Sequence, residues 1–552
     1  MTKFSLVLVC ILSFSTLSFA QKTPPPNGWH MLDKEVDGVY GISAVKAYDF
    51  IKSKKLKSKT VIVAVIDSGI DTLHEDLKPV LWTNPREIPG NGIDDDKNGY
   101  VDDVHGWNFL GGKDGRNVKE DSYEASRVYH SLSSKYTGKE PEDIDAKDKP
   151  EYEMWVRAKE NIMGDVDPEE ITFIKTLYPK FVKGDSIIMK DLGKAEYNCT
   201  DLKKYSATDR DAYMVKSLCL STCKENNIDD ITNKQIFEDF DAKLKKAASA
   251  ESAPKEYRKE IVGDDETNIN DRRYGNNDIM TGTPMHGTHC AGIIGGVRDN
   301  GKGVDGIADN VRIMMLRAVP DGDEHDKDVA NAIRYAVDNG AQIISMSFGK
   351  DFSPQKQWVD DAFRYAESKN VLLVKAAGND AKNIDNGENF PSATYLNGKG
   401  TASNVITVGA SGDPKTGSIT ANFSNYGKKE VDVFAPGVRI YSTLPGGNNY
   451  GNLNGTSMAC PLVAGIAALT LEYFPALSAK QLKYVIEKSA QQPDYKVTKP
   501  GSNEIVNLID ISKTGGIVNA YKALALAATL KGERKTQKEV LPKPKMIKTK
   551  KG

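Results

Sequence analysis

The chain has 552 residues, of which 27% are charged and 39% are hydrophobic, and its formal net charge at pH 7 is -2. A chain of this length can bury a large core and is long enough for several domains. Because acidic and basic residues are almost balanced, neither nucleic acid nor an anionic membrane is expected as a partner.

The first 20 residues have the pattern of a secretory signal peptide. Lys3 precedes the apolar run 4–12, and residues 18–20 (Ser-Phe-Ala) form a small-x-small cleavage site. This run is too short for a transmembrane helix, and no later apolar run approaches 18 residues. We therefore expect a secreted protein, extracellular or periplasmic, with no transmembrane segment.

Residues 21–58 form an N-terminal segment, in which the apolar spacing predicts one helix within residues 39–56. The next stretch, 61–66, is an unbroken apolar run, which is typical of a central parallel strand covered on both faces. The run ends on Asp67. Open parallel sheets place their functional groups at the carboxyl ends of strands, so Asp67 is a candidate site residue.

An acidic loop after this strand has the spacing of a calcium-binding loop. Asp94, Asp96, Asn98 and Asp102 occupy positions one, three, five and nine, with a glycine at position six, and the carbonyl of Tyr100 can supply a further ligand. The pattern departs at position twelve, where a histidine replaces the bidentate glutamate. We expect either a structural calcium ion or an acidic, turn-rich loop without metal.

Between residues 113 and 271 the strand-like runs stop, and Lys and Glu become frequent. Apolar residues recur there at helical spacing, which predicts a long helical insertion. We assign no chemistry to this insertion and expect a solvated helical subdomain with no direct catalytic part.

Five cysteines remain once the signal peptide is removed, and an odd number cannot pair completely within one chain. In the insertion, Cys199 could pair with Cys219 or with Cys223, and the pattern does not choose between them. Cys290 and Cys460 lie in helical segments rich in small residues and are expected to be buried free thiols.

After the insertion, strand-like and helix-like segments alternate, which predicts βαβ units and a parallel sheet with right-handed crossovers. From residue 531 the chain is rich in Lys and almost without apolar residues, which predicts a disordered tail. The expected strands are 312–319, 342–348, 371–376, 405–409 and 431–434, and the expected helices are 329–339, 358–369, 461–473, 479–490 and 518–530.

Three stretches in this half of the chain carry residues suited to nucleophilic catalysis. His286 begins the stretch His-Gly-Thr-His-Cys-Ala-Gly, at the start of a small-residue helix. Asn379 follows a predicted strand in the stretch Ala-Ala-Gly-Asn-Asp, where it could also be part of an ordinary turn. Ser457 lies in Gly-Thr-Ser-Met-Ala-Cys-Pro, at the first turn of a buried helix, where a serine could also be an N-cap.

Asp67, His286 and Ser457 occur in the chain order of the subtilisins. With all three motifs intact, the chain resembles the subtilisin-like (S8 family, subtilase) serine proteases over residues 59–112 and 272–495. The resemblance implies a doubly wound, mostly parallel α/β sheet flanked by helices, with a large helical insertion. The expected domains are the signal peptide (1–20), the N-terminal segment (21–58), the catalytic domain (59–112 and 272–530), the insertion (113–271) and the basic tail (531–552).

The resemblance also implies roles for these residues. His286 would act as the general base, Asp67 would hold its tautomer, and Ser457 would attack the peptide carbonyl. The oxyanion would bind the backbone N–H of Ser457 and the side chain of Asn379, while His289 would be structural and His74, family-like in position, would not be the base. No cofactor is needed for this chemistry, and an ordinary histidine pKa of about 6.5 predicts activity that falls below that pH.

Polypeptide substrates are expected to bind as an extended strand. Residues 321–326 resemble one edge of the family's cleft. Their acidic side chains could favour basic side chains upstream of the cut, or they could form a solvated loop in which Asp326 or Asp328 caps the next helix. The segment that resembles the opposite wall is Ser345, Met346, Ser347, Phe348 and Gly349.

These patterns predict a secreted, monomeric serine endopeptidase. One alternative is a catalytically inactive binding module on the same scaffold, which the intact set of site residues disfavours. A second is a lipase or esterase of the α/β-hydrolase type, which requires Gly-x-Ser-x-Gly and the chain order Ser, Asp, His. Neither requirement fits this chain.

Overall fold

A computed structural model describes residues 26–534, except 165–167, 195, 227–231, 235, 238, 239, 242, 243, 246, 247, 249–251, 283 and 415–417. The predicted signal peptide, 1–20, lies outside the described residues, as does most of the predicted tail. Within the described part, residue 534 still contacts the folded domain, because Arg534 donates a hydrogen bond to the carbonyl of Leu477.

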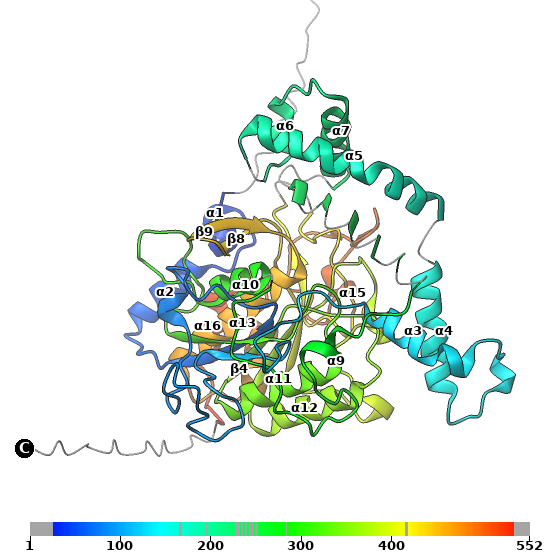
Figure 1. Ribbon diagram of the computed structural model, residues 1–552. Helices are drawn as coiled ribbons and strands as arrows, with labels where there is room; N and C mark the ends of the chain where they lie inside the picture. The colour runs from blue at the N-terminus through cyan, green and yellow to red at the C-terminus, as the bar shows by residue number, and fades with distance from the viewer. Residues whose placement is uncertain are drawn as a thin grey trace, which may run out of the picture.

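A seven-stranded sheet forms the centre of the molecule, with strand order β2-β3-β1-β4-β5-β6-β7 (Figure 1). Every neighbouring pair in this sheet is parallel. The strands are β1 (Val61–Asp67), β2 (Gly106–Asn108), β3 (Val311–Arg317), β4 (Ile343–Met346), β5 (Leu372–Ala376), β6 (Val405–Ser411) and β7 (Val433–Pro436).

Helices cover both faces of the sheet because consecutive strand residues point to opposite sides. Val63 and Val65 of β1 belong to one hydrophobic core with α10, α13, α14 and α16. Ala64 and Ile66 belong to a second core with α11 and α12. This is the predicted doubly wound α/β fold. The helices are α10 (Met285–Gly295), α11 (Asp326–Asp338), α12 (Lys356–Ser368), α13 (Thr456–Tyr473), α14 (Ala479–Ser489) and α16 (Ala520–Ala527).

The chain reverses its direction of winding at β1, which lies between β3 and β4. The register brings several strand ends to one edge, since Asp67 lies opposite Arg317 and Met346 lies opposite Lys375. The side chain of Arg317 is buried and binds the carbonyls of Ser68 and Val118. Arg317 therefore holds the loop after β1 against the segment at Val118, at the carboxyl edge of the sheet.

Two parts of this domain differ from the sequence prediction. Helix α13 begins at Thr456 rather than at 461, so Pro461 lies inside it. The glycine-rich stretch before it, 446–451, for which no strand was predicted, includes the start of strand β9, which pairs with β8 in an antiparallel hairpin. The remaining elements of this domain are α1 (Lys34–Asp37), α2 (Ala44–Ser53), β8 (Ile440–Leu444), β9 (Asn449–Leu453), β10 (Val497–Thr498), β11 (Ile505–Val506) and α15 (Leu508–Ile511).

The N-terminal segment packs against the catalytic domain. Trp29 is fully buried, and its indole N–H donates a hydrogen bond to the carbonyl of Val438 at 2.9 Å. Ser43 accepts a hydrogen bond from the side chain of Asn519. Helix α2 thus lies against α16, near the other end of the described chain.

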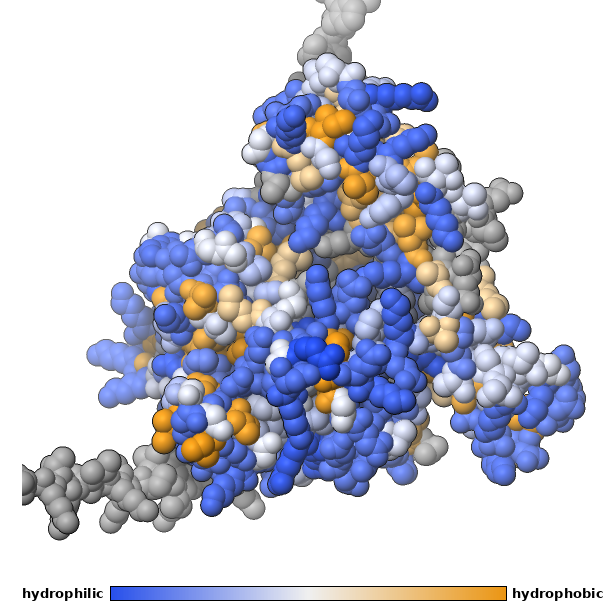
Figure 2. Space-filling model, viewed as in Figure 1, coloured by the Kyte–Doolittle hydropathy of each residue, from blue (hydrophilic) through white to orange (hydrophobic). Residues whose placement is uncertain are grey.

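The insertion contains two helical units with separate cores (Figure 1). A disulfide joins Cys199 to Cys223 in the second unit, while Cys219 is free and buried, which settles the pairing that the sequence left open. On the face shown in Figure 2, apolar side chains gather on this second unit, where Val182 and Tyr213 are exposed. The helices of the insertion are α3 (Glu124–Tyr136), α4 (Lys149–Gly164), α5 (Pro168–Leu192), α6 (Cys199–Lys204), α7 (Arg210–Asn226) and α9 (Tyr257–Ile261).

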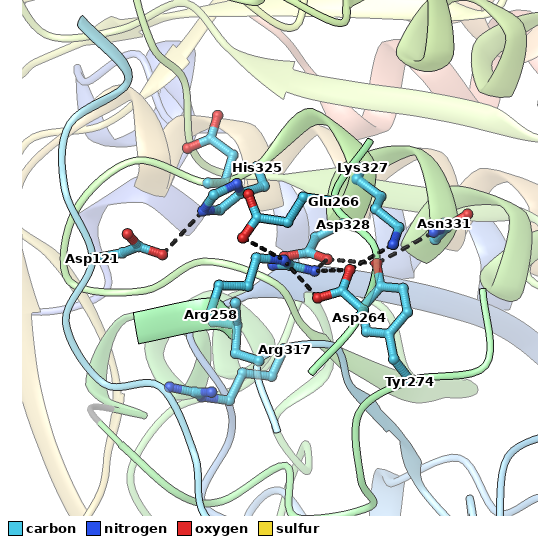
Figure 3. A network of polar contacts seen from close by, with 12 residues as sticks. Asp121, Arg258, Asp264, Glu266, Tyr274, Arg317, His325, Lys327, Asp328 and Asn331 are labelled. Atoms are coloured by element: carbon cyan, nitrogen blue, oxygen red, sulfur yellow. Dashed lines mark hydrogen bonds and ion pairs between the residues drawn. The ribbon is translucent and has the colours of Figure 1, made fainter. Parts of the chain in front are cut away.

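Both ends of the insertion lie in the core of the sheet domain. Val118 and Val262 pack in the same cluster as α11. Figure 3 shows Arg258 of α9 beside Asp264 and Asp328, within a buried polar network. The segments that enter and leave the helical units are therefore part of the packed domain.

Helix α13 is the one helix of the described residues that is long and apolar enough to cross a membrane. Of its 18-residue window, 89% is buried inside the protein. Its composition is that of a core helix, in agreement with its position against β4, β5 and β6.

Candidate active site

Asp67 and His286 form the best-defined contact at the carboxyl edge of the sheet. Asp67 is the last residue of β1, and His286 lies in the first turn of α10. The Nδ1 atom of His286 lies 2.8 Å and 3.0 Å from the two carboxylate oxygens of Asp67. Gly287 permits this approach, because a Cβ atom there would lie 2.1 Å from the carbonyl oxygen of Gly69.

The environment of His286 raises the pKa of its imidazole well above the ordinary value. Burial opposes the positive charge, but the carboxylate of Asp67 and the neighbouring Cys290 together outweigh it. The side chain of Asp67 is 2% exposed, so little solvent screens this pair. A pKa raised in this way predicts that activity falls at a higher pH than an unperturbed histidine would give.

Ser457 is the second residue of α13, and the N-cap of this helix is Gly455, at a φ of 147°. Ser457 is therefore not a capping residue, and its backbone N–H belongs to the unsatisfied first turn. In this structure its hydroxyl donates a hydrogen bond to the carbonyl of Ser347 at 3.0 Å. No hydrogen bond between Ser457 and His286 is present among the described residues.

A carbonyl left without its helical partner by Pro461 helps to hold the start of α13 against the end of β4. Proline has no N–H, so the carbonyl of Ser457, four residues earlier, lacks its helical partner. The hydroxyl of Ser347 donates to that carbonyl at 2.9 Å, and the thiol of Cys290 approaches it at 3.5 Å. The sulfur of Cys290 also lies 4.0 Å from Nδ1 of His286, so Cys290 lies between the two helix starts.

Asn379 follows β5 and is oriented by the first residue of α13. Its side-chain oxygen accepts hydrogen bonds from the N–H and the hydroxyl of Thr456, both at 2.9 Å. The hydroxyl of Thr456 in turn accepts a hydrogen bond from the N–H of Gly378. Because both groups of Thr456 donate to Asn379, only one orientation of the Asn379 amide fits, with its oxygen toward Thr456. The Nδ2 atom remains as a donor, and Asn379 lines the same cavity as Ser457.

This cavity has a volume of about 300 Å³. Phe348 and Gly349, two residues of the predicted substrate-binding wall, line it. Ser345 and Met346 do not fit that prediction, because both side chains are buried in the sheet, where Ser345 faces Cys460. They belong to β4, whereas the cleft begins after the strand ends.

The acidic loop at 321–326 contributes Asp323 and Glu324 to the same cavity. Neither Asp326 nor Asp328 caps α11, whose N-cap residue is His325. Asp326 instead accepts hydrogen bonds from Ser353 and Gln355, and Asp328 pairs with Arg258. Glu324 and the buried Lys350 were not singled out from the sequence, although the acidic composition of the loop was the available signal.

The predicted calcium loop contributes to a cluster of carboxylates, but the residues of this cluster differ from the predicted ligands. Oxygens of Glu87, Asp94 and Asp96 lie within 4.8 Å of one another. Glu87 is 7% exposed, and one of its oxygens has no hydrogen-bond partner among the described residues. Asp102 points elsewhere, since its carboxylate accepts hydrogen bonds from the N–H groups of residues 90, 91 and 92.

Asn98 and Tyr100, the other two predicted ligands, make hydrogen bonds in and beside this loop. The side-chain oxygen of Asn98 accepts from the N–H of Tyr100, and the hydroxyl of Tyr100 donates to the carbonyl of Arg272. Gly99 has a φ of 98°, which favours glycine at this turn. The unpartnered oxygen of Glu87 and the all-oxygen donor set fit a hard divalent cation.

The two other histidines near the motifs make structural contacts. His289 is buried, its Nε2 lies 3.2 Å from the carbonyl of Gly451, and burial lowers its pKa to about 3. His74 places Nε2 3.0 Å from the carbonyl of Asn449. Both residues connect to the β8–β9 hairpin.

A sequence model of the subtilase family matches residues 58–508. A thermophilic serine proteinase from Bacillus sp. (strain AK1) is 43% identical over 33% of this chain and 42% of that protein. Thermitase from Thermoactinomyces vulgaris is 38% identical over 43% of this chain and 74% of that protein. The chain thus spans less than half of the length of the Bacillus proteinase and about three quarters of the length of thermitase.

Among solved structures, a protease from Pseudoalteromonas arctica PAMC 21717 aligns over 91% of this chain and 98% of that chain, with a TM-score of 0.46 and 18% identity. The family match covers most of the chain and both parts of the sheet domain, on either side of the insertion. The chain therefore belongs to the subtilase family of serine peptidases.

Proposed function

We propose that this subtilase hydrolyses peptide bonds with Asp67, His286 and Ser457 as its catalytic triad. The observation that carries the proposal is the contact between Nδ1 of His286 and the buried carboxylate of Asp67, next to the helix start that presents Ser457. A buried carboxylate on Nδ1 leaves Nε2 as the nitrogen that can take a proton.

In the first step, the hydroxyl of Ser457 leaves the carbonyl of Ser347 and turns toward Nε2 of His286. Hydrogen bonds between nucleophile and base are often absent or long before substrate binds, so the present rotamer is compatible with this role. Ser457 then attacks the peptide carbonyl while His286 takes its proton, and the imidazolium is stabilised by Asp67. His286 next protonates the leaving amine, and water hydrolyses the acyl-enzyme by the same route.

The oxyanion formed in each step would bind Nδ2 of Asn379 and the N–H of Ser457. Thr456 holds the amide of Asn379 before substrate arrives, so its orientation costs little during the reaction. The positive end of α13 adds to this stabilisation. Loss of one such donor in an acyl-transfer site reduces kcat by about 10²–10³-fold.

We further propose that the protein is secreted and that a calcium ion stabilises it. The pattern of residues 1–20 supports secretion. The cluster of Glu87, Asp94 and Asp96 supports a cation site, which would be structural because the triad needs no metal. The cation would offset the repulsion between these carboxylates, which otherwise opposes closure of the loop.

The experiment that tests the triad is labelling with a fluorophosphonate probe, together with hydrolysis of a peptide library. We expect Ser457→Ala to abolish both signals and to keep the melting temperature of the parent. Ser53→Ala, which removes an exposed serine at a helix end, should leave both signals unchanged. Labelling that persists in Ser457→Ala would refute the assignment, and an unlabelled parent protein would favour an inactive binding module.

A further inference from the structure

The cavity beside Ser457 has an unusually acidic lining. Four carboxyl groups line it, and Lys350 is its single cationic lining residue among the described part of the chain. Such a set is expected to attract a positively charged group into the cavity. The four acidic residues are Asp323, Glu324, Asp351 and Asp380.

Lys350 does not balance the negative charge of the cavity, because it already forms ion pairs with carboxylates outside the cavity. Its Nζ lies 2.7 Å from Glu124 and 3.0 Å from Asp326, and these three side chains are at most 6% exposed. Its third hydrogen bond goes to the backbone carbonyl of Glu324. Neither Glu124 nor Asp326 lines the cavity, so the charge of Lys350 is compensated from outside it.

Glu324 is the one buried member of the set. The residue is 2% exposed, and its Oε1 atom is buried without a hydrogen-bond partner in the described structure. Burial, reinforced by the charge of Asp323, raises the pKa of this carboxyl group to about 8 although Lys350 opposes the shift. A buried carboxylate without a partner is costly, and a cation brought by a ligand would remove that cost.

The neighbours of Glu324 are held in place by hydrogen bonds. The carboxylate of Asp323 accepts the N–H of Glu124 at 2.8 Å, which ties this loop to the start of α3. Asp326 is fixed by Ser353 and by the N–H of Gln355. The first helix of the insertion therefore anchors the loop that carries Glu324.

We infer that Glu324 is a specificity-determining residue, which binds a lysine or arginine side chain of the peptide substrate close to the scissile bond. This inference depends on the proposed peptidase function. A cavity of about 300 Å³ lies at the small end of ligand sites and suits one long side chain. Phe348 would contact the aliphatic part of that side chain, and the carboxylate of Glu324 would accept hydrogen bonds from its charged end.

The test is a set of fluorogenic peptides in which each of four positions on either side of the cut carries Arg, Lys, Gln, norleucine or Glu. We expect one position to favour Arg or Lys over Gln by at least tenfold in kcat/KM. Glu324→Gln, which keeps the shape of the side chain, should remove that preference, so that the Arg, Lys and Gln peptides are cleaved with similar kcat/KM. Asp321→Asn, an exposed acid of the same loop that pairs with Lys245, is the matched control and should keep the preference.

A second measurement needs no variant. The ratio of kcat/KM for the Arg peptide to that for the norleucine peptide should rise as the pH passes through about 8, as Glu324 ionises in the free enzyme. Protonation of His286 affects both peptides equally and cancels in this ratio.

The outcomes separate the two proposals. Peptide cleavage without a basic preference, a flat pH ratio, or equal loss in Asp321→Asn would overturn the role of Glu324 and leave the peptidase standing. Absence of all cleavage and of fluorophosphonate labelling would refute the peptidase itself.

Discussion

The guanidinium of Arg258 and the carboxylate of Asp328 form a buried two-point ion pair, with N–O distances of 2.5 Å and 2.7 Å. Their side chains are 3% and 0% exposed. The pair joins α9, at the end of the insertion, to α11 of the sheet domain. Asp264 and Tyr274 complete the network (Figure 3).

Removal of Arg258 should destabilise the sheet domain. Arg258→Met leaves Asp328 and Asp264 buried with less compensation, which is expected to cost about 3–5 kcal/mol of unfolding free energy. Urea unfolding, measured in the Ser457→Ala background to prevent autolysis, checks this value. Lys259→Ala, on the exposed side of the same helix, is the control and should leave the unfolding midpoint unchanged. If Arg258→Met had the same unfolding free energy as its parent, α9 would not anchor the insertion.

The pH profile of kcat/KM should have its acidic limb above pH 6.5. The base must be neutral to accept a proton, and the raised pKa of His286 means that the imidazole loses its proton only at higher pH. Measurement with an uncharged peptide between pH 5 and 10 locates the limb, and this peptide avoids the titration of Glu324.

Asp67→Asn provides the control for the cause of this shift. Without the carboxylate, only Cys290 still opposes the effect of burial on the pKa of His286, so the limb should move to lower pH while kcat falls by about 10⁴-fold. A parent limb at or below pH 6.5, or an unmoved limb in Asp67→Asn, would contradict this account of the site.

A bulky thiol reagent that reaches Cys290 should inactivate the enzyme. The sulfur lies 4.0 Å from Nδ1 of His286 and one helical turn after it, so a mercurial would displace the imidazole from Asp67. Burial raises the pKa of this thiol, and the reaction should therefore accelerate with rising pH. The rate of inactivation is measured by titration with p-chloromercuribenzoate.

Two variants identify the thiol that reacts. Cys290→Ala should resist the reagent and retain activity, whereas Cys219→Ala should be inactivated like the parent, because Cys219 lies in the insertion. Inactivation that persists in Cys290→Ala would indicate Cys460 of α13, whose sulfur contacts the carbonyl of Val374 in β5.

Chelation should lower the melting temperature if the loop binds calcium. A ligand that binds only the folded state stabilises it by about 2.7 kcal/mol at a concentration one hundred times its Kd. Thermal unfolding of Ser457→Ala with EDTA and with added calcium measures the effect. Peptide turnover by the parent at low temperature should change little, since the triad contains no metal.

Two substitutions separate the carboxylate cluster from the loop that supports it. Glu87→Gln should abolish the increase in melting temperature that calcium causes. Asp102→Asn should lower the melting temperature with and without calcium, because Asp102 binds backbone N–H groups of the loop. A melting curve insensitive to EDTA, with no calcium by elemental analysis, would leave an acidic loop without metal.

The sequence alone determined the α/β class and the family. Apolar runs such as 61–66 predict buried strands from neighbouring residues alone, because hydrophobic patterning is local. The motifs around Asp67, His286 and Ser457 are equally local, since each sets a strand end or a helix start. Their chain order was therefore enough to indicate the family, which the match over 58–508 shows.

Only the tertiary structure decided which distant residues meet. Cys199 pairs with Cys223 rather than Cys219 because of how α6 packs on α7, and no spacing rule specifies that choice. Pro461 appeared to mark the start of a helix, but contacts from Ser347 and Cys290 compensate for its missing hydrogen bond and allow α13 to begin earlier.

Contacts between distant segments also explain why the sequence did not indicate two acidic residues, Glu87 and Glu324. Glu87 and Glu324 look like ordinary surface glutamates in the sequence, since Glu is rarely buried. Packing buries each of them and leaves one oxygen of each unpartnered. Burial and partnership depend on segments far apart in the chain, so these carboxylates gain their significance only when the fold encloses them.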